Sequence, residues 1–407
     1  MKRLFILGAG ASIDHSKGFL PSTRNFLVKA RKIPELDFYH DLDEPEVIIS
    51  SGGDSGNELE AYPRDPLSDE SETTQRYLSR LYGIDVNNLG RTDPTAGLSS
   101  KDHKKALLIK RLEDVNIEEL LTLVMIARQI DPSQPSEDHI INLIVQTINY
   151  YSQQIDHKNG AYNEFVEQLD CESDSIITFN WDTLLDKLFS ENYAPPIRTT
   201  TGIIAYHSNF LEVCTAEREN SFDSDRIKSP YIPDSILRES KATIPFGSHY
   251  IKLHGSINLV YCTNILCENY QKPLIRKGHL WQHNRCGPCH EALKLYIIPP
   301  IQNKPIRDMP YIRRSWNKAQ ELCMAAEQVV FWGYSLPPTD HWSNWLVRQI
   351  WAGKCKEIIV INPECFLNGK ENESFINRFC PKDRFGNKQI ERVAFNEFKE
   401  YLKTRED

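Results

Sequence analysis

The sequence predicts an α/β protein built on a Rossmann-like, doubly wound parallel sheet, with a large helical insertion and a small four-cysteine module. Three observations predict this fold. Short apolar runs recur along the chain, helical stretches follow several of them, and two close pairs of cysteines lie in its second half. Strands that alternate with helices favour a parallel sheet covered on both faces.

Five apolar runs have the length and composition of buried strands. Each is rich in Ile, Val, Leu or aromatic residues: Leu4–Leu7, Ser175–Thr178, Tyr250–Leu253, Val329–Trp332 and Glu357–Ile361. Runs that are apolar on both faces are typical of the interior of a parallel sheet. Helices are expected between or after these strands, for example at Asp182–Phe189 and Pro310–Gln328.

The gap between the first two strands is far too long for one crossover, and part of it has helical patterning. Asn116 begins a capping-box pattern that predicts a helix through about Gln129. Ser136 is placed to cap a second helix through about Gln153. Residues 41–72 hold eleven acidic residues against one Arg, so we expect an exposed acidic loop there.

These elements divide the chain into three expected parts. They are a sheet domain of residues 1–30, 170–261 and 291–407, a helical insertion of residues 31–169, and a cysteine module of residues 262–290. The stretch 207–248 has weak periodicity, and no element is assigned to it.

Composition and charge argue against several classes of protein. The 407 residues are 40% hydrophobic with a formal net charge of −8, which argues against nucleic-acid binding by charge alone. No run approaches the roughly 18 apolar residues of a membrane span, and the apolar start is too short for a signal peptide. We therefore expect a cytoplasmic protein whose ten cysteines are mostly free thiols or metal ligands.

The first expected strand ends in a glycine-rich turn, Gly8-Ala9-Gly10-Ala11-Ser12. Glycines at this place let backbone N–H groups approach a pyrophosphate beside a helix N-terminus. The match to G-x-G-x-x-G is incomplete, because an isoleucine stands where the third glycine belongs. A tight strand-to-helix turn without a ligand is the alternative interpretation.

Polar side chains end the next two strands. Thr178, Asn180 and Asp182 follow the second strand. The Asn180 amide can hold a ribose hydroxyl or a water, and the Asp182 carboxylate can hold a carboxamide or simply cap the following helix. His254, followed by Gly255, ends the third strand. Histidine is the usual base near neutral pH, although a single histidine is more often structural.

The last two strands end in similar groups. Gly333 and Ser335 follow the fourth strand and suit phosphate contact, and Asn362 follows the fifth and suits a ribose hydroxyl. Each of these could be only a strand-to-loop turn. Taken together, however, five strand ends carry small or polar groups at the carboxyl edge, where open α/β sheets bind ligands. The sequence therefore predicts one ligand site along that edge.

The most specific local pattern is a set of four cysteines, Cys262, Cys267, Cys286 and Cys289. Two close pairs of thiolates are what a closed tetrahedral zinc site needs, and such a site is structural because no coordination position stays open. Four unligated thiols are the alternative, and nearby histidines could replace one cysteine.

These motifs, in this order, resemble those of the sirtuin superfamily. The glycine-rich turn is followed by Gly18, Pro21 and Arg24, similar to the family's cofactor loop. Thr178-x-Asn180-x-Asp182 is similar to its Thr-Gln-Asn-x-Asp, and His254-Gly255 to its catalytic His-Gly. The two cysteine pairs follow like its zinc module, and Gly333-x-Ser335-Leu336 and Ile361-Asn362 are similar to its later phosphate and ribose contacts.

The departures from that family concern the peptide groove. Phe179 replaces the family's Gln, no Phe precedes Arg24, and Tyr296-Ile-Ile-Pro-Pro stands in place of a Phe-Gly-Glu stretch. The sequence is more similar to the divergent sirtuin-like proteins of prokaryotic antiphage defence, which hydrolyse NAD⁺. That resemblance implies depletion of NAD⁺ in abortive infection, a homo-oligomer, and a HerA-type hexameric ATPase as a further partner.

The resemblance also implies roles for individual residues. NAD⁺ is the substrate and Zn²⁺ a structural ion. Asn180 positions the attacking water and ribose, His254 is the general base, and Asp182 holds the nicotinamide amide. The remaining dinucleotide contacts are Gly8, Ala9, Gly10, Ser12, Arg24, Thr178, Gly333, Ser335 and Asn362. Two alternatives stay open, an NAD-dependent protein deacylase and a non-catalytic sensor of ADP-ribose or NAD in an oligomeric assembly.

Overall fold

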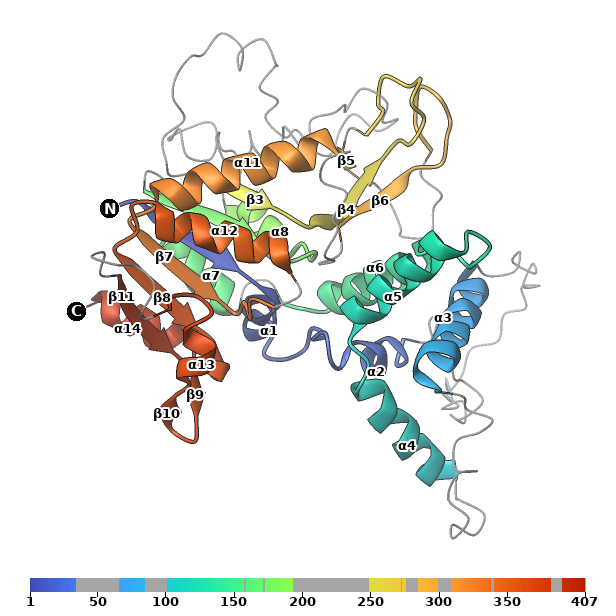
Figure 1. Ribbon diagram of the computed structural model, residues 1–407, viewed down its shortest axis with the longest axis horizontal. Coiled ribbons are helices and arrows are strands. Elements are labelled where there is room, and N and C mark those ends of the chain that lie inside the picture. Colours follow the sequence, from blue (N-terminus) through green and yellow to red (C-terminus); the bar gives the residue numbers. More distant parts are fainter. Residues whose placement is uncertain are drawn as a thin grey trace, which may run out of the picture. The chain divides into compact units, whose positions relative to one another are not determined.

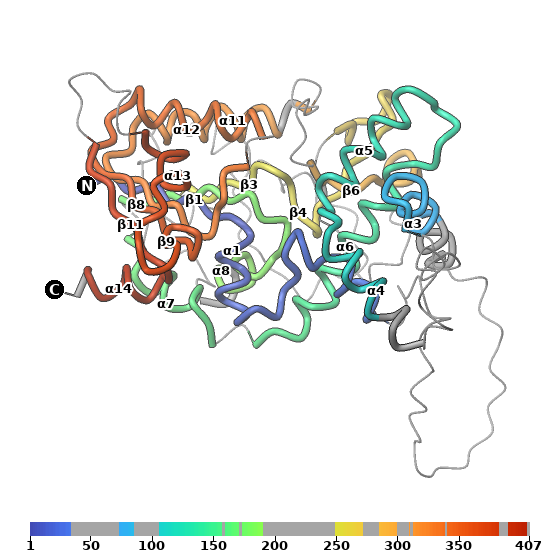
Figure 2. The backbone as a smooth tube through the Cα atoms, turned by 60° about the horizontal axis from the view of Figure 1, so that its bottom comes forward, coloured from blue at the N-terminus to red at the C-terminus, as the bar shows by residue number. Residues whose placement is uncertain are grey.

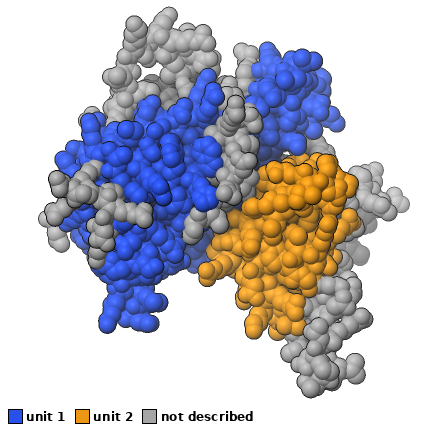
Figure 3. Space-filling model, in the orientation of Figure 1, with its two compact units in different colours: residues 1–20, 151–407 blue, residues 21–150 orange. Residues whose placement is uncertain are grey.

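The computed structural model describes residues 1–33, 66–84, 101–156, 159–170, 173–192, 249–271, 273–275, 285–298, 309–337, 340–381 and 390–406. It contains two compact units, residues 1–20 with 151–407 and residues 21–150 (Figure 3). The expected insertion at 31–169 overlaps the second unit, while residues 151–169 belong with the first and residues 21–30 with the second.

The first unit contains a six-stranded sheet in which all neighbouring strands are parallel. Its strands in spatial order are β11 (Glu391–Phe395), β8 (Glu357–Ile361), β7 (Gln328–Trp332), β1 (Arg3–Leu7), β2 (Asp174–Thr178) and β3 (Tyr250–Lys252). The chain moves outward from β1 to β3 on one side and from β7 to β11 on the other. This order confirms the doubly wound fold and puts the topological switch point between β1 and β7.

All five predicted strands form, each within one residue of its expected ends. Two details differ from the prediction. Gln328 begins β7 rather than ending the preceding helix, because Ala326 already has extended backbone. The sixth strand, β11, escapes the prediction because Glu391 and Arg392 interrupt its apolar run at the edge of the sheet.

Helices cover both faces of the sheet, as Figures 1 and 2 show. One face carries α11 (Pro310–Ala325) and α12 (His341–Ala352). The other carries α1 (Ala9–His15), α7 (Ala161–Glu167), α8 (Leu184–Asn192) and α14 (Phe398–Glu406). Parallel strands must be covered in this way because their side chains are apolar on both sides.

Successive side chains of each strand point to opposite helical layers. Phe331 of β7 belongs to the apolar cluster shared with α11 and α12. Its neighbour Trp332 points the other way and stacks on Phe398 of α14 with ring centroids 3.9 Å apart. Phe5 of β1 meets Phe165 of α7 edge-on at 4.9 Å. The strands are therefore fixed from both sides, which holds their carboxyl ends in place.

The second unit is helical, as expected for an insertion. It comprises α2 (Phe26–Ala30), α3 (Pro66–Tyr82), α4 (Lys101–Glu113), α5 (Ile117–Ile130) and most of α6 (Asp138–Gln153). The Asn116 side chain accepts hydrogen bonds from the N–H groups of Glu118 and Glu119 at 2.9 and 3.4 Å, which confirms the predicted cap. Ser136 accepts from the Asp138 N–H at 3.2 Å at the start of α6.

The expected acidic loop at 41–72 needs correction in its last part. Residues 66–72 form the first turns of α3, and residues 41–65 lie outside the described residues. Pro66 suits the first position of a helix, where its missing N–H costs nothing. Acidic residues in the first turns interact favourably with the helix dipole, so a charge-rich stretch is compatible with this helix start.

A small antiparallel sheet follows the large one. It is formed by β4 (Gly255–Tyr261), β5 (Pro273–Ile275) and β6 (Lys294–Ile297), in the order β5-β4-β6. A short excursion after β8 contains η6 (Pro363–Cys365), β9 (Phe366–Leu367), β10 (Lys370–Glu371) and α13 (Glu373–Ile376). The unassigned stretch 207–248 lies outside the described residues. Within the described part of the chain, no helix has the length and apolarity needed to cross a membrane.

Candidate functional site

Close backbone packing joins the ends of β1 and β7 at the switch point. A methyl group on Gly8 would lie 2.6 Å from Tyr334 Cα, and one on Gly10 would lie 2.7 Å from Gly333 Cα. Gly333 has a φ of +62°, and a methyl group there would lie 2.1 Å from the Ala11 nitrogen. The Gly10 N–H donates to the Gly333 carbonyl at 2.8 Å. These glycines are thus required by the packing of the two turns themselves.

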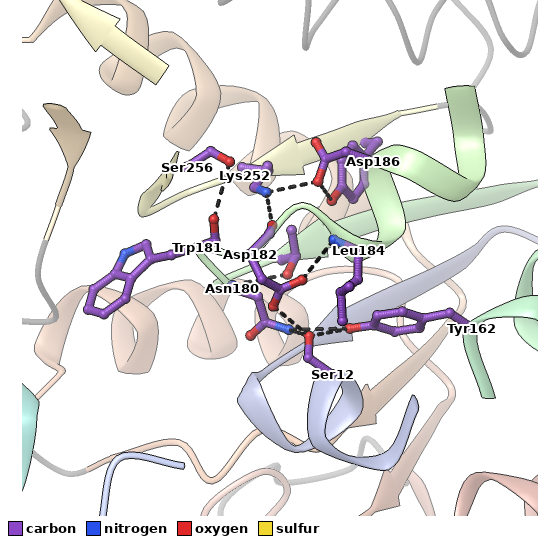
Figure 4. Close-up of polar contacts among 11 residues, drawn as sticks. Ser12, Tyr162, Asn180, Trp181, Asp182, Leu184, Asp186, Lys252 and Ser256 are labelled. Carbon is purple, nitrogen blue, oxygen red and sulfur yellow. Dashed lines mark hydrogen bonds and ion pairs between the residues drawn. The ribbon is translucent and has the colours of Figure 1, made fainter. Parts of the chain in front are cut away.

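The end of β2 carries Asn180, whose side-chain amide is anchored to the β1 turn (Figure 4). Asn180 Nδ2 donates to the Gly8 carbonyl at 2.9 Å and to Ser12 Oγ at 2.9 Å. The Asn180 N–H donates to Thr178 Oγ1 at 3.1 Å. With the amide nitrogen directed at Ser12, the amide oxygen points away from it, as Figure 4 shows. Predicted residues from two separate strand ends therefore meet here.

Ser12 is the centre of this arrangement. Its hydroxyl donates to Asp182 Oδ2 at 2.7 Å, lies 2.8 Å from the Tyr162 hydroxyl and accepts from Asn180. A hydroxyl has one proton and two lone pairs. Since the proton goes to the carboxylate, Tyr162 must donate, and the Ser12 hydroxyl is then saturated. Through these hydrogen bonds Ser12 holds the side chains of Asn180 and Asp182 in place.

Asp182 accepts hydrogen bonds at both carboxylate oxygens. Besides the Ser12 contact, its Oδ1 accepts from the Leu184 N–H at 3.0 Å, where α8 begins. This is the helix-capping role that the sequence left open for Asp182. Lys252 of β3 also donates to the Asp182 carbonyl and pairs with Asp186 Oδ2 at 3.0 Å. The loop from Asn180 to α8 is thereby tied to the neighbouring strand (Figure 4).

Tyr162 is a site residue that the sequence prediction missed. It lies on α7, in a stretch assigned to the helical insertion, and its side chain is buried. Its ring stacks on His15 at 4.9 Å. Burial, reinforced by the Asp182 charge, raises the pKa of the Tyr162 phenol well above its ordinary value. The phenol is therefore a neutral donor toward Ser12 across the physiological range.

His254 lies two residues after the end of β3, the strand next to β2. The Leu253 N–H donates to the Thr178 carbonyl at 3.0 Å, which places His254 and Asn180 at the ends of paired strands. The ring of Phe179 meets the His254 imidazole edge-on at 5.0 Å. Two predicted catalytic residues thus lie at the same carboxyl edge, on adjacent strands.

Gly255 makes the turn after His254 possible. Its φ is +76°, and a methyl group would lie 1.8 Å from the Tyr296 carbonyl oxygen. Only glycine fits both the backbone conformation and this contact. The His-Gly pair therefore has a physical basis, because the glycine lets the chain turn from β3 into β4 directly behind the histidine.

Asp340 is the second residue that the sequence prediction missed. Its Oδ2 lies 3.6 Å from His254 Nε2, and both side chains are buried. Asp340 precedes α12, and its Oδ1 accepts from the Ser343 N–H at 3.1 Å. Aspartate directly before a helical stretch is a capping signal, and that signal could have located the residue but not its histidine neighbour.

The other residues that were predicted to contact the dinucleotide differ from one another in their surroundings. Asn362 Nδ2 donates to the Tyr334 carbonyl at 3.4 Å, which links the ends of β8 and β7. The Ser335 side chain is half-buried beside this contact, and Ala9 is exposed at the start of α1. Arg24 is exposed and belongs to the second compact unit.

The four predicted cysteines come together beside the small antiparallel sheet, in segments that follow β4 and precede β6. Their sulfur atoms all lie within 4.8 Å of one another, and the Cys262–Cys289 and Cys267–Cys286 pairs are each 3.5 Å apart. A tetrahedral zinc site with bonds of about 2.3 Å separates its sulfurs by about 3.8 Å, so the four residues fit this ion. Burial raises the pKa of Cys262 to about 12, and a bound cation would favour its thiolate.

The chain is similar to solved structures of Sir2 proteins. One is a Sir2 homolog in complex with NAD, 14% identical, covering 72% of this chain and 77% of that chain with a TM-score of 0.33. Another is Sir2 bound to acetylated peptide, 14% identical, covering 70% and 82% with a TM-score of 0.34. A third, described as the structural basis of sirtuin substrate affinity, is 12% identical and covers 99% and 92% with a TM-score of 0.34.

Comparison of the sequence with family models and curated proteins gives no match. The similar structures belong to the family that the motifs resemble. The strand order of the sheet establishes the fold.

Proposed function

We propose that this protein is an NAD⁺ glycohydrolase that cleaves the nicotinamide–ribose bond to give nicotinamide and ADP-ribose. One observation carries the proposal. Asn180 and His254 follow the adjacent strands β2 and β3 at the carboxyl edge of a sheet with the strand order of dinucleotide-binding folds. An amide and an imidazole are the groups that this hydrolysis needs, one to position water and ribose and one to accept a proton.

The proposed reaction passes through an oxocarbenium-like ribose, as glycoside hydrolysis does. The oxygen of Asn180 points away from Ser12 and would orient the attacking water and a ribose hydroxyl. His254 would accept the proton that the nucleophile loses. The dipoles fixed around Asn180 are preorganised before substrate binds, which is how a site stabilises developing charge at little cost.

Asp182 has a different proposed task from the one expected. Since both of its carboxylate oxygens already accept hydrogen bonds, we propose that it holds Ser12 and the start of α8 in place. Contact with the nicotinamide amide would require one of these bonds to be exchanged. The phosphate and ribose contacts of Gly8, Gly10, Gly333 and Asn362 remain proposals of the same model.

The physiological part of the proposal rests on the resemblance of the sequence motifs. NAD⁺ depletion would serve antiphage defence by abortive infection, in a homo-oligomer and with a HerA-type ATPase as a further partner. Loss of cellular NAD⁺ after infection in cells that express the wild-type chain, but not in cells that express N180A, would support this role. Equal NAD⁺ loss in both strains would contradict it.

The direct test is chromatography of NAD⁺ incubated with the pure protein, with and without an acylated peptide. We expect nicotinamide and ADP-ribose in equal amounts without peptide. Nicotinamide release that strictly requires the peptide would favour the deacylase alternative instead. Binding of ADP-ribose without any turnover, even with infected-cell extract added as activator, would favour a sensor.

A further inference from the structure

The second catalytic candidate, His254, has a carboxylate partner that comes from a different part of the chain. His254 Nε2 and Asp340 Oδ2 are 3.6 Å apart, with 5% and 1% of the two side chains exposed. In the sequence the two residues are separated by β4, the cysteine module, β6, α11 and β7, so their proximity is a product of the fold. No motif in the sequence pairs them.

The surroundings of this pair strengthen the electrostatic interaction between the carboxylate and the imidazole. The imidazole of His254 has the ring of Phe179 at 5.0 Å and the ring of Trp316 at 6.5 Å. Trp316 is itself fixed, since its indole N–H donates to the Leu253 carbonyl at 3.3 Å. Between aromatic walls with little water, an electrostatic interaction is stronger than at an exposed surface.

Asp340 is held rigidly by groups other than the histidine. Its Oδ1 accepts from the Ser343 N–H at 3.1 Å and its Oδ2 from the Ser343 hydroxyl at 2.6 Å. Its N–H donates to the Pro337 carbonyl at 3.1 Å. The carboxylate also lies at the N-terminus of α12, where the helix dipole favours negative charge. Capping alone would explain Asp340, but capping does not require a histidine within 4 Å.

We propose that Asp340 is a positioning residue for His254. Its carboxylate orients the imidazole with the Nε2–H toward Asp340, which leaves Nδ1 as the atom that accepts a proton. When Nδ1 takes the proton from water or a ribose hydroxyl, the imidazolium that forms is stabilised by the nearby negative charge. This inference rests on the proposed function for its chemistry, but the orientation of the ring can be measured without any turnover.

The experiment compares D340N with the wild-type chain. Asparagine caps helices about as well as aspartate, so D340N keeps the cap of α12 while it removes the charge and turns one acceptor oxygen into an N–H donor. D340S, which keeps a capping hydroxyl, is the second variant in case D340N folds poorly. D14N is the matched control, because Asp14 lies on α1 of the same compact unit and accepts from Trp332 rather than from a histidine.

The first readout is the ¹⁵N–¹H spectrum of the histidine rings, with the His254 signals assigned by H254A. We expect the His254 ring-nitrogen signals to shift in D340N and D340S and to stay in place in D14N. Unchanged His254 signals in both variants would overturn the inference. This readout decides it even if the wild-type protein releases no nicotinamide, a result that would count against the proposed function alone.

The second readout is the kinetics of nicotinamide release. If His254 is the base, D340N should lower kcat by roughly tenfold or more with KM for NAD⁺ nearly unchanged, because general-base catalysis contributes about 100-fold or more. D14N should leave both constants unchanged. A wild-type kcat in D340N, or a lower kcat without a shift of the His254 signals, would overturn the positioning role.

Discussion

Two neighbouring strand ends at the same sheet edge hold their polar side chains in different ways. Asn180 is held by hydrogen bonds to Gly8 and Ser12, within a group of buried polar residues whose hydroxyls and carboxylate are all used. His254 packs against aromatic rings and has the carboxylate of Asp340 beside it. We call the first arrangement the Asn180 network and the second the His254 pocket.

From this difference we predict which kinds of substitution disturb each arrangement. In the Asn180 network every hydrogen-bonding group depends on the others, so the loss of one leaves the rest unsatisfied in a buried place. In the His254 pocket the ring packs against aromatic side chains, and the Asp340 carboxylate lies 3.6 Å from its Nε2. Changes of hydrogen bonding should therefore damage the first, and changes of charge the second.

The largest expected effect comes from removal of the Asn180 amide. N180A should lower the rate of nicotinamide release by about 100- to 1000-fold, because a preorganised polar group at the reacting centre contributes on that scale. Initial rates by chromatography would measure it. N159A is the matched control, because Asn159 is exposed in the same compact unit. A rate for N180A equal to that of N159A would remove Asn180 from the mechanism.

Metal removal should separate the two arrangements. The chain runs from His254 through β4 directly into Cys262, whereas the Asn180 network lies at the ends of β1 and β2 and on α1 and α7. Chelation should release about one Zn²⁺ per chain and speed hydrogen exchange in β4 and β6, while β1 and β2 stay protected. Metal analysis and amide exchange would measure this. Faster exchange in β1 and β2 than in β4 would contradict the separation.

S12A tests whether Ser12 holds its neighbours or binds phosphate. If it holds the Asn180 network, S12A should lower kcat roughly tenfold and lower the free energy of unfolding by about 1–3 kcal/mol, since Asp182 and Tyr162 lose a buried partner. Urea unfolding and steady-state kinetics would measure both. A higher KM with unchanged kcat and stability would point to a phosphate contact instead.

The smallest expected effect is that of Y162F, which deletes one hydroxyl of the same network. We expect a loss of about 1 kcal/mol in the free energy of unfolding, the usual worth of one hydrogen bond. The pKa of Tyr162 is raised in the folded protein. The contribution of its hydroxyl to the free energy of unfolding is therefore present below about pH 10 and falls as the pH rises above the ordinary tyrosine pKa. Urea unfolding from pH 8 to 11 should therefore show the wild-type and Y162F stabilities converging. Parallel curves would contradict a buried, neutral phenol.

Much of this fold can be predicted from the sequence because its strongest signals are local. Five apolar runs mark five of the six central strands, and Asn116 marks the start of α5 through its own side chain. The cysteine cluster is also local, since its four members lie within one short segment. The sequence does not predict β11, because Glu391 and Arg392 interrupt its apolar run. An edge strand does not need a continuous apolar run.

The contacts inside the site are harder to predict because they join distant segments. Tyr162 reaches Ser12 across 150 positions, and nothing in its helix marks it as part of a polar network. Asp340 carries the signature of a helix cap, so its second neighbour His254 cannot be read from the sequence around it. Single strand ends can be proposed from residue types, but their partners are set by the three-dimensional packing.

A crystal structure of the protein with ADP-ribose would test the central claim most directly. We predict that the distal ribose, which carries the nicotinamide in NAD⁺, lies between Asn180 and His254, with the pyrophosphate beside the Gly8–Gly10 turn and Gly333. A ribose bound out of reach of both Asn180 and His254 would contradict it.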